Sequence, residues 1–212
     1  MKPDLAAAIH LLHRAPFGVL ATHAVRMPGY PFSTALPFVV DEAHCPVFLL
    51  SGLAEHTKNL LASPQASLLV IDAGQANVLE SPRMTLVGDV HRIDAAPALR
   101  ERYVRYLPDA EQYLALGDFA FFRLVPQRVR YIGGFAQMGW LEQDAWQAAQ
   151  VLGLDEEADL LRGFGAHVLG VDCYGIDLVR DGHRERAAFD DVLSPAHILD
   201  EAKRVLAEES RE

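Results

Sequence analysis

The segment from Ser51 to Leu61 brings together residue types that bind anions. Its sequence, SGLAEHTKNLL, passes from the end of an apolar, strand-like run into a helical pattern. The first N–H groups of a helix have no partner within the helix, so this turn offers backbone donors beside the Thr57 hydroxyl and the Lys58 ammonium. These groups predict a phosphate-sized anion site. The residues alone leave a second interpretation open, in which the polar side chains of this segment form a solvated helix face.

The patterns of the common catalytic sites are missing from the sequence. It contains no GxSxG, GxxxxGK[ST], HExxH or GxGxxG run, which disfavours standard hydrolases, nucleotide kinases and Rossmann dehydrogenases. Only His10 and His13 are closely spaced among nine histidines, so we expect solvated or locally bonded histidines and no metal site. Cys45 and Cys173 form no CxxC pair, which fits a reducing compartment. No residue is assigned as a general acid or base, and the catalytic residues stay unknown.

Composition and charge narrow the classes of partner. The 212 residues are 50% hydrophobic and carry a net charge of −10, and the tail from residue 154 holds 7 basic and 15 acidic residues. A protein that tracks phosphates needs a basic face, so nucleic-acid binding is disfavoured. The sequence has no apolar run near the roughly 20 residues of a membrane helix. We expect a globular, cytoplasmic protein.

Short runs rich in β-branched and aromatic residues predict the sheet that carries the anion-binding turn. We expect strands at residues 17–25, 32–40, 46–51, 66–72, 83–93, 118–126 and 128–134. Helical periodicity predicts helices over residues 4–14, 54–61 and 96–116. So many strands with so few crossover helices favour a closed or nearly closed antiparallel barrel over a parallel α/β sheet.

After Trp140 the sequence becomes more helical. The expected elements are helices over 143–153 and 156–163, strands at 173–180 and 184–189 around an Asp181-Gly182 turn, and a last helix from Ser194-Pro195. We therefore predict a mainly β fold with α (α+β), in which a barrel domain over residues 1–142 is followed by a small acidic α+β subdomain over residues 150–212.

Six runs in the first two thirds of the chain together resemble a known family. They are Phe17-Gly18-Val19-Leu20-Ala21-Thr22-His23, Pro28-Gly29-Tyr30-Pro31-Phe32, His56-Thr57-Lys58-Asn59-Leu60, Ala66-Ser67-Leu68-Leu69-Val70, Arg83-Met84-Thr85-Leu86-Val87-Gly88 and Ile132-Gly133-Gly134-Phe135. In this order they resemble the pyridoxamine 5′-phosphate oxidase-like FMN-binding split barrels, in particular the branch of HugZ-type haem-utilisation proteins. The resemblance covers about residues 5–142 and implies a split β-barrel that holds FMN.

The resemblance also implies where the cofactor binds. The isoalloxazine ring would face Thr34, Ala35 and Leu36, because a flat ring needs apolar walls and a few backbone contacts. The phosphate would be surrounded by Ser51, His56, Thr57, Lys58 and Asn59, which supply a cation and neutral donors. Arg83 begins a strand that runs along the dimer interface in this family, so it serves FMN, a subunit contact or neither. Ala136 replaces the usual glycine of the motif at residues 135–141, and we expect Trp140 to pack in the core.

Three functions follow from the resemblance. The first is an FMN-dependent oxidoreductase of unknown substrate, and the second a haem-binding or haem-degrading protein. The usual Met-Asn-x-Asp-His run of the tail is missing, which weighs against haem, since haem iron needs a rigidly held axial ligand. The third is a flavin-binding protein without catalytic activity. The resemblance further implies a homodimer, and the apolar strand at 84–90, expected near a sheet edge, would be covered by it.

Overall fold

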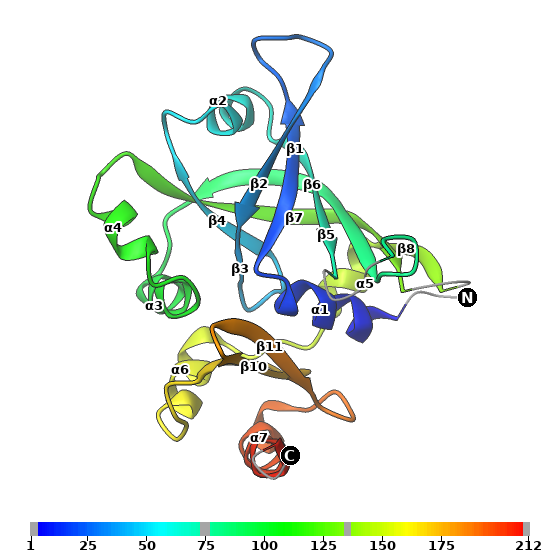
Figure 1. The fold of residues 1–212 in the computed structure, drawn as a ribbon, viewed down its shortest axis with the longest axis vertical. Coiled ribbons are helices and arrows are strands. Elements are labelled where there is room, and N and C mark those ends of the chain that lie inside the picture. Colours follow the sequence, from blue (N-terminus) through cyan, green and yellow to red (C-terminus); the bar gives the residue numbers. More distant parts are fainter. Residues whose placement is uncertain (1–3, 73–76, 134–136, 210–212) are drawn as a thin grey trace.

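The computed structural model describes residues 4–72, 77–133 and 137–209. Its main feature is an eight-stranded antiparallel sheet that curls into a barrel (Figure 1). The strands are β1 (Phe17–His23), β2 (Pro31–Pro37), β3 (Val39–Val40), β4 (Pro46–Ser51), β5 (Gln65–Ile71), β6 (Arg83–Ile93), β7 (Phe119–Ile132) and β8 (Met138–Glu142). Their order is β2-β1-β5-β6-β7-β4-β3, with β8 paired to β7. The predicted antiparallel barrel within an α+β fold is confirmed.

The two ends of this strand order are neighbours in the sequence. Only Phe38, which is fully buried, separates β2 from β3. The chain therefore steps from one end of the sheet to the other and links the ends covalently, so the single strand expected over residues 32–40 is two strands. The expectation that the strand at 84–90 lies near an edge is wrong, because β6 lies between β5 and β7.

A β-bulge explains why β7 is one strand where two were predicted. Gly88 lies opposite Pro126 and Val87 opposite Arg128, so Gln127 has no counterpart on β6. The bulge accommodates a proline, which has no N–H for the ladder. A Cβ at Gly88 would collide with the backbone carbonyl of Val125, so the close approach of the strands requires glycine here.

Helices cover the open parts of the barrel. α1 (Leu5–Arg14) follows the N-cap residue Asp4, whose side chain accepts hydrogen bonds from two backbone N–H groups. α2 (Glu55–Ala62) follows β4 and packs against β1 and β2. The helix expected over 96–116 is two helices, α3 (Pro97–Tyr106) and α4 (Ala110–Leu114), because Pro108 interrupts the chain between them.

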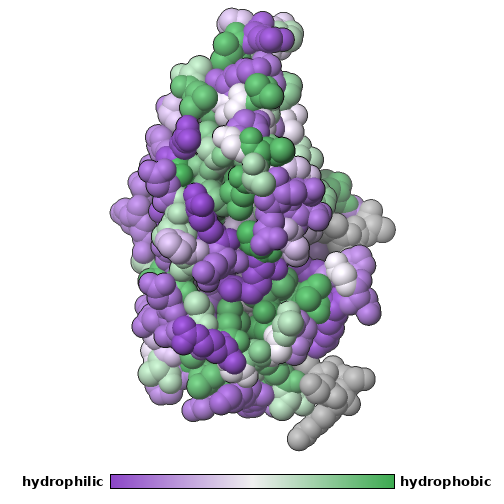
Figure 2. Space-filling model, turned by 90° about the vertical axis from the view of Figure 1, so that its left-hand side faces the viewer, coloured by the Kyte–Doolittle hydropathy of each residue, from purple (hydrophilic) through white to green (hydrophobic). Residues whose placement is uncertain are grey.

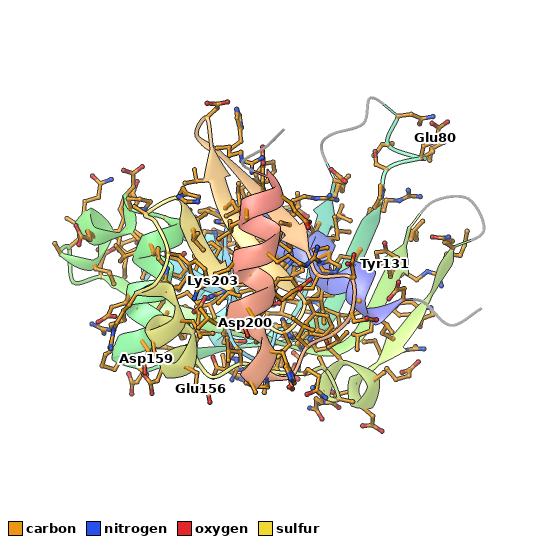
Figure 3. The ribbon with its side chains drawn as sticks, turned by 90° about the horizontal axis from the view of Figure 1, so that it is seen from below. Glu80, Tyr131, Glu156, Asp159, Asp200 and Lys203 are labelled. Carbon is orange, nitrogen blue, oxygen red and sulfur yellow. The ribbon has the colours of Figure 1, made fainter. Side chains whose placement is uncertain are left out.

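The C-terminal part forms a second sheet. After α5 (Gln143–Gln147) and α6 (Leu154–Leu161) come β9 (Val168–Val171), β10 (Gly175–Arg180), β11 (His183–Ala188) and α7 (Pro195–Glu209). The order of this sheet is β11-β10-β9, and α7 crosses its outer face (Figure 3). The predicted Asp181-Gly182 hairpin is confirmed, with positive φ at both residues as a tight hairpin turn requires.

A continuous hydrophobic core joins the two sheets through α1. It includes Phe48 and Leu68 of the barrel, Ile9 of α1, Ile176 of β10 and Ile198 of α7, all at most 1% exposed. α1 lies between the barrel and the second sheet (Figure 1). None of the helices in the described part of the chain has the length and hydropathy of a membrane span.

Candidate functional site

The start of α2 presents hydrogen-bond donors that have no partner in the described part of the chain. Ala54 is the N-cap residue but supplies no side-chain acceptor, so the first N–H groups of the helix stay open. Thr57 is 2% exposed, and its Oγ1 has no hydrogen-bond partner among the described residues. Lys58 is exposed beside it. We call Thr57, Lys58, His56 and the open N–H groups the α2 cluster; it can bind an anion.

His56 lies in the same turn of helix. Its side chain is 9% exposed, and burial lowers its pKa, so the ring is neutral at pH 7. It makes no hydrogen bond to the described residues, in contrast to the buried histidines considered below. A neutral imidazole without a protein partner is the form that ligates a metal or a haem iron.

Two other predicted site residues near α2, Asn59 and Ser51, have partners within the protein. Asn59 is fully buried and links α2 to the barrel, with Oδ1 accepting from Val25 N and Nδ2 donating to Thr22 Oγ1, both at 3.0 Å. Ser51 Oγ donates to Asp118 across 2.6 Å. These bonds fix the position of α2 and of the turn before it.

Arg83 is not near the α2 cluster within one chain. Its Nη1 donates to the carbonyl oxygens of Val78, Leu79 and Ser81, so it holds the turn before β6 together. It pairs with Ile71 at the far end of β5. Six residues of strand, about 20 Å, separate that end from the end of β5 that follows α2.

The predicted ring-binding residues lie on β2, which forms one end of the barrel sheet. Ala35 is exposed, and Thr34 and Leu36 are half-buried. Phe32 on the same strand is 36% exposed, and Tyr30 in the β1–β2 hairpin is 63% exposed. Figure 2 shows hydrophobic side chains exposed among polar ones over the upper part of one face, below the tip that this hairpin forms in Figure 1. The strand thus offers a partly apolar surface beside α2.

The motif at residues 135–141 is only partly visible. Phe135 and Ala136 lie outside the described residues. The expectation that Trp140 packs in the core is wrong, because the residue is 42% exposed and its ring centroid lies 4.5 Å from the Arg128 guanidinium and 5.6 Å from that of Arg130. This pairing is a cation–π contact at the surface of β7 and β8.

A second polar cluster joins the barrel to the C-terminal sheet, and sequence reasoning missed it. The junction cluster consists of His13, His44, Tyr106, Asp172 and Asp177, each at most 7% exposed, and of Arg186, whose side chain is 2% exposed. Arg186 donates to Asp177 across 2.6 Å and to both oxygens of Asp172. Tyr106 donates to Asp177 across 2.5 Å. Its members come from α1, the β3–β4 turn, α3 and the second sheet, so they are far apart in the sequence and form no local motif that would predict the cluster.

The hydrogen bonds of the junction cluster assign its protons. His44 Nε2 lies 3.0 Å from the carbonyl oxygen of Gln150 and therefore donates. Burial lowers the pKa of His44 to about 4, so the ring is neutral and Nδ1 accepts. His13 Nε2 donates to that Nδ1 across 3.0 Å, and His13 Nδ1 donates to Asp177 across 3.1 Å. His13 is thus an imidazolium, which with Arg186 balances the two carboxylates.

The same hydrogen bonds bear on whether the junction cluster can bind a metal ion. His13, His44 and Asp172 offer ligand atoms within 4.8 Å of one another, the kind of grouping that can hold a metal ion. Both ring nitrogens of each histidine already bond to protein groups. Metal binding would have to displace those protons next to the Arg186 guanidinium. The arrangement therefore fits a structural hydrogen-bond network better than a metal centre.

Part of the chain is similar in sequence to known proteins. A family model described as "CREG, beta-barrel" matches residues 3–148. A curated relative, the non-canonical heme oxygenase HOZ, chloroplastic, of Arabidopsis thaliana, is 37% identical over 141 residues. This match covers 63% of the present chain and 43% of the relative, less than half of its length.

Two solved structures are similar over almost the whole chain. Atu2129, a protein of unknown function from Agrobacterium tumefaciens, has a TM-score of 0.74 at 23% identity and covers 96% of this chain and 94% of its own. A heme binding protein from Mycobacterium smegmatis has a TM-score of 0.65 at 22% identity, with 100% of both chains covered. At these identities the similarity shows a common fold, which includes the C-terminal sheet.

Proposed function

Because this chain belongs to the CREG β-barrel family, we propose that it is a haem-binding protein of the haem oxygenase type, with its site on β2 and α2. The relative named a heme oxygenase supports haem, since its 37% identity extends over 141 residues. In the structure, the observation that carries the proposal is His56, a neutral, largely buried histidine that makes no hydrogen bond to the residues that the structure describes.

Three other histidines, the buried His13 and His44 and the half-buried His10, suit haem less well. Both nitrogens of His13 and of His44 bond to protein groups. His10 Nδ1 accepts from Arg186 Nε at 3.0 Å, and burial, reinforced by the charge of Arg186, lowers the pKa of His10 to about 4. His10 therefore carries its proton on Nε2. An iron ligand needs an unprotonated nitrogen, which His56 can supply without breaking a bond.

The rest of the α2 cluster fits the acidic side chains of haem. Haem combines a flat apolar ring with carboxylates, and the cluster combines the open N–H groups of α2, the Thr57 hydroxyl and the Lys58 ammonium. The partly apolar surface of β2 lies beside them and would support the ring. When bound, haem would supply the redox chemistry, while the protein holds and orients it.

A visible spectrum tests the proposal directly. Addition of haem to the purified protein should give a saturable Soret band, and His56→Ala should lower haem affinity about tenfold or more, as loss of a metal-site group does. His91→Ala is the matched control, since His91 is exposed on β6. A haem affinity unchanged in His56→Ala would contradict the assignment of His56, and no binding at all would contradict the function.

FMN is the second candidate, and the α2 cluster favours it for a separate reason. The open N–H groups at the start of α2, the Thr57 hydroxyl and the Lys58 ammonium match the needs of a dianionic phosphate. A solvated helix face would not need a buried hydroxyl that has no partner among the described residues. In this case the protein would be a flavin-dependent oxidoreductase, or a flavin-binding protein without its own reaction. Flavin absorption bands in the purified protein would support FMN.

Lys58→Met separates a phosphate contact from a surface lysine. Loss of a charged partner of the phosphate costs about 1.5–3 kcal/mol, roughly ten- to a hundredfold in affinity. FMN should therefore weaken far more than riboflavin, which has no phosphate, when both are titrated by flavin fluorescence. Equal losses for the two ligands would show that Lys58 does not bind the phosphate.

We also propose that the protein forms a homodimer through the surface of β2. This strand lies at one end of the sheet order and, with the hairpin before it, exposes Phe32, Tyr30 and Met27. Exposed edge strands with apolar side chains are normally covered. Light scattering at micromolar concentration should give twice the chain mass, and a monomer mass would contradict the proposal.

A further inference from the structure

A cavity at the opposite end of β4 from the α2 cluster has the features of a second binding site. It has a volume of ≈ 240 Å³ and lies between the β3–β4 turn, β7 and α5. Arg123, which lines it, pairs with Val47 near the start of β4, whereas Ser51 before α2 ends the strand. The cavity is therefore separate from the surface proposed for haem or FMN.

Trp146 gives the cavity an unused hydrogen-bond donor. Its side chain lines the cavity and is 2% exposed, and its Nε1 has no hydrogen-bond partner among the described residues. An indole N–H can only donate. A buried donor without an acceptor costs free energy, so its presence beside a cavity points to a ligand that supplies the acceptor.

Arg123 brings a second donor, but its charge is already balanced. Its Nε lies 2.5 Å from Asp41 Oδ2, and Glu42 adds a further negative charge close by. The other oxygen of Asp41 accepts from the backbone N–H groups of Ala43 and Cys45 at 3.0 and 2.9 Å. The pair therefore leaves guanidinium N–H groups to donate and no net positive charge to attract an anion.

Apart from the exposed, polar Gln147, the remaining lining is apolar or unreactive. Val125, Pro126, Ala149 and Val151 provide aliphatic surface. The Cys45 thiol also lines the cavity, and burial raises its pKa to about 12, so it is neither a nucleophile nor a metal ligand at neutral pH. These walls suit a small apolar group, and the chemistry of the cavity is binding and not covalent catalysis.

We propose that this cavity binds a small neutral carbonyl compound, such as a ketone or a tertiary amide, with a short apolar body. One carbonyl oxygen has two lone pairs and can accept from both Trp146 Nε1 and the Arg123 guanidinium. The aliphatic lining contacts the apolar body. A carboxylate is disfavoured by Asp41 and Glu42, and an ammonium finds no free acceptor on the Asp41–Arg123 pair.

Nuclear magnetic resonance of the indole N–H groups tests this proposal. The chain has two tryptophans, so the ¹H–¹⁵N signal that remains in Trp140→Phe belongs to Trp146. Titration with cyclopentanone and with N-methylpyrrolidone should shift that signal saturably, with a dissociation constant of about 1 mM or tighter for ligands of this size. Butanoate and pyrrolidinium, of similar size but charged, should bind at least fivefold more weakly.

A rim variant shows whether binding occurs in this cavity. Val151 is 49% exposed and lines it, so Val151→Phe should fill it and weaken ketone binding fivefold or more without disturbing the core. Val192→Phe is the control, since Val192 is 47% exposed and does not line the cavity. Absence of a saturable shift, equal affinity in Val151→Phe, or tighter binding of butanoate or pyrrolidinium would each overturn the proposal.

Discussion

At α2 a buried hydroxyl, Thr57 Oγ1, has no hydrogen-bond partner among the described residues, whereas at the junction the hydroxyl of Tyr106 donates to Asp177 across 2.5 Å. The same contrast holds for the histidines. His56 makes no hydrogen bond to the described residues, while both nitrogens of His13 bond to protein groups. Residue type alone therefore does not tell which of the two clusters binds a ligand.

The two clusters differ in how many of their hydrogen-bonding and charged groups have partners within the described part of the protein. In the junction cluster two cations face two carboxylates, and each buried group has partners on another element. Such a network contributes to the attachment of the C-terminal sheet and leaves nothing for a ligand to bond. The α2 cluster keeps open donors close to the surface. A change in the junction should therefore alter stability, and a change at α2 should alter binding.

The largest effect is expected from Arg186→Met. This change leaves Asp172 and Asp177 buried beside a single cation, His13, and the free energy of unfolding should fall by about 3–5 kcal/mol. Urea denaturation measures it. Arg204→Met is the matched control, because Arg204 is 44% exposed and pairs with acidic residues of its own helix, so its loss should change the free energy of unfolding far less than the loss of Arg186. Similar losses in the two variants would refute the structural role of the junction.

A smaller effect concerns pH and His44. Its pKa of about 4 in the folded protein lies below the ordinary 6.5, so the unfolded chain binds more protons between these values. The contribution of His44 to the free energy of unfolding is therefore fully present above pH 6.5. It is lost as the pH falls to 4, by about 3 kcal/mol in total. His10 acts in the same direction, whereas the pKa of Asp41, raised to about 6 by burial, acts in the opposite one.

His44→Asn isolates that contribution. His44 has a φ of 55°, a left-handed conformation that asparagine adopts readily, so the backbone of the turn should be kept. His10 and Asp41 are present in both proteins and cancel in the comparison. Between pH 7 and 4 the wild type should lose about 3 kcal/mol more than the variant in urea denaturation. Parallel pH profiles would show that the His44 ring is not held neutral.

The smallest effects are expected when the hydroxyl groups of Thr57 and Tyr106 are each removed. Thr57→Val removes a buried hydroxyl without a partner and should stabilise the ligand-free protein by up to about 1 kcal/mol, while it weakens cofactor binding. Tyr106→Phe removes a hydroxyl that bonds to a carboxylate and should destabilise the protein by about 1–2 kcal/mol. Thermal denaturation of each variant without cofactor shows whether its stability rises or falls. A loss of stability in Thr57→Val would mean that its hydroxyl already has a partner.

Local patterns in the sequence determined most of the elements. Alternation predicted β6 with the bounds that the structure has, and Asp4 marked the start of α1. The Asp181-Gly182 pair specified its hairpin, because both positions require positive φ. The helix start after Ser51 was also evident. These features depend on neighbours in the chain, so a single sequence contains the information.

Only the tertiary structure decided which polar groups have partners. Asn59 and Thr57 are two residues apart on α2, yet the first is held by Thr22 and Val25, while the hydroxyl of the second has no partner in the described part of the chain. His13 meets Asp177 across 164 residues of chain. Pro126 continues β7 because the strand bulges at Gln127, opposite Val87 and Gly88 of β6. Each outcome depends on contacts between distant segments, which no local spacing encodes, because burial and hydrogen bonding are fixed only when those segments pack.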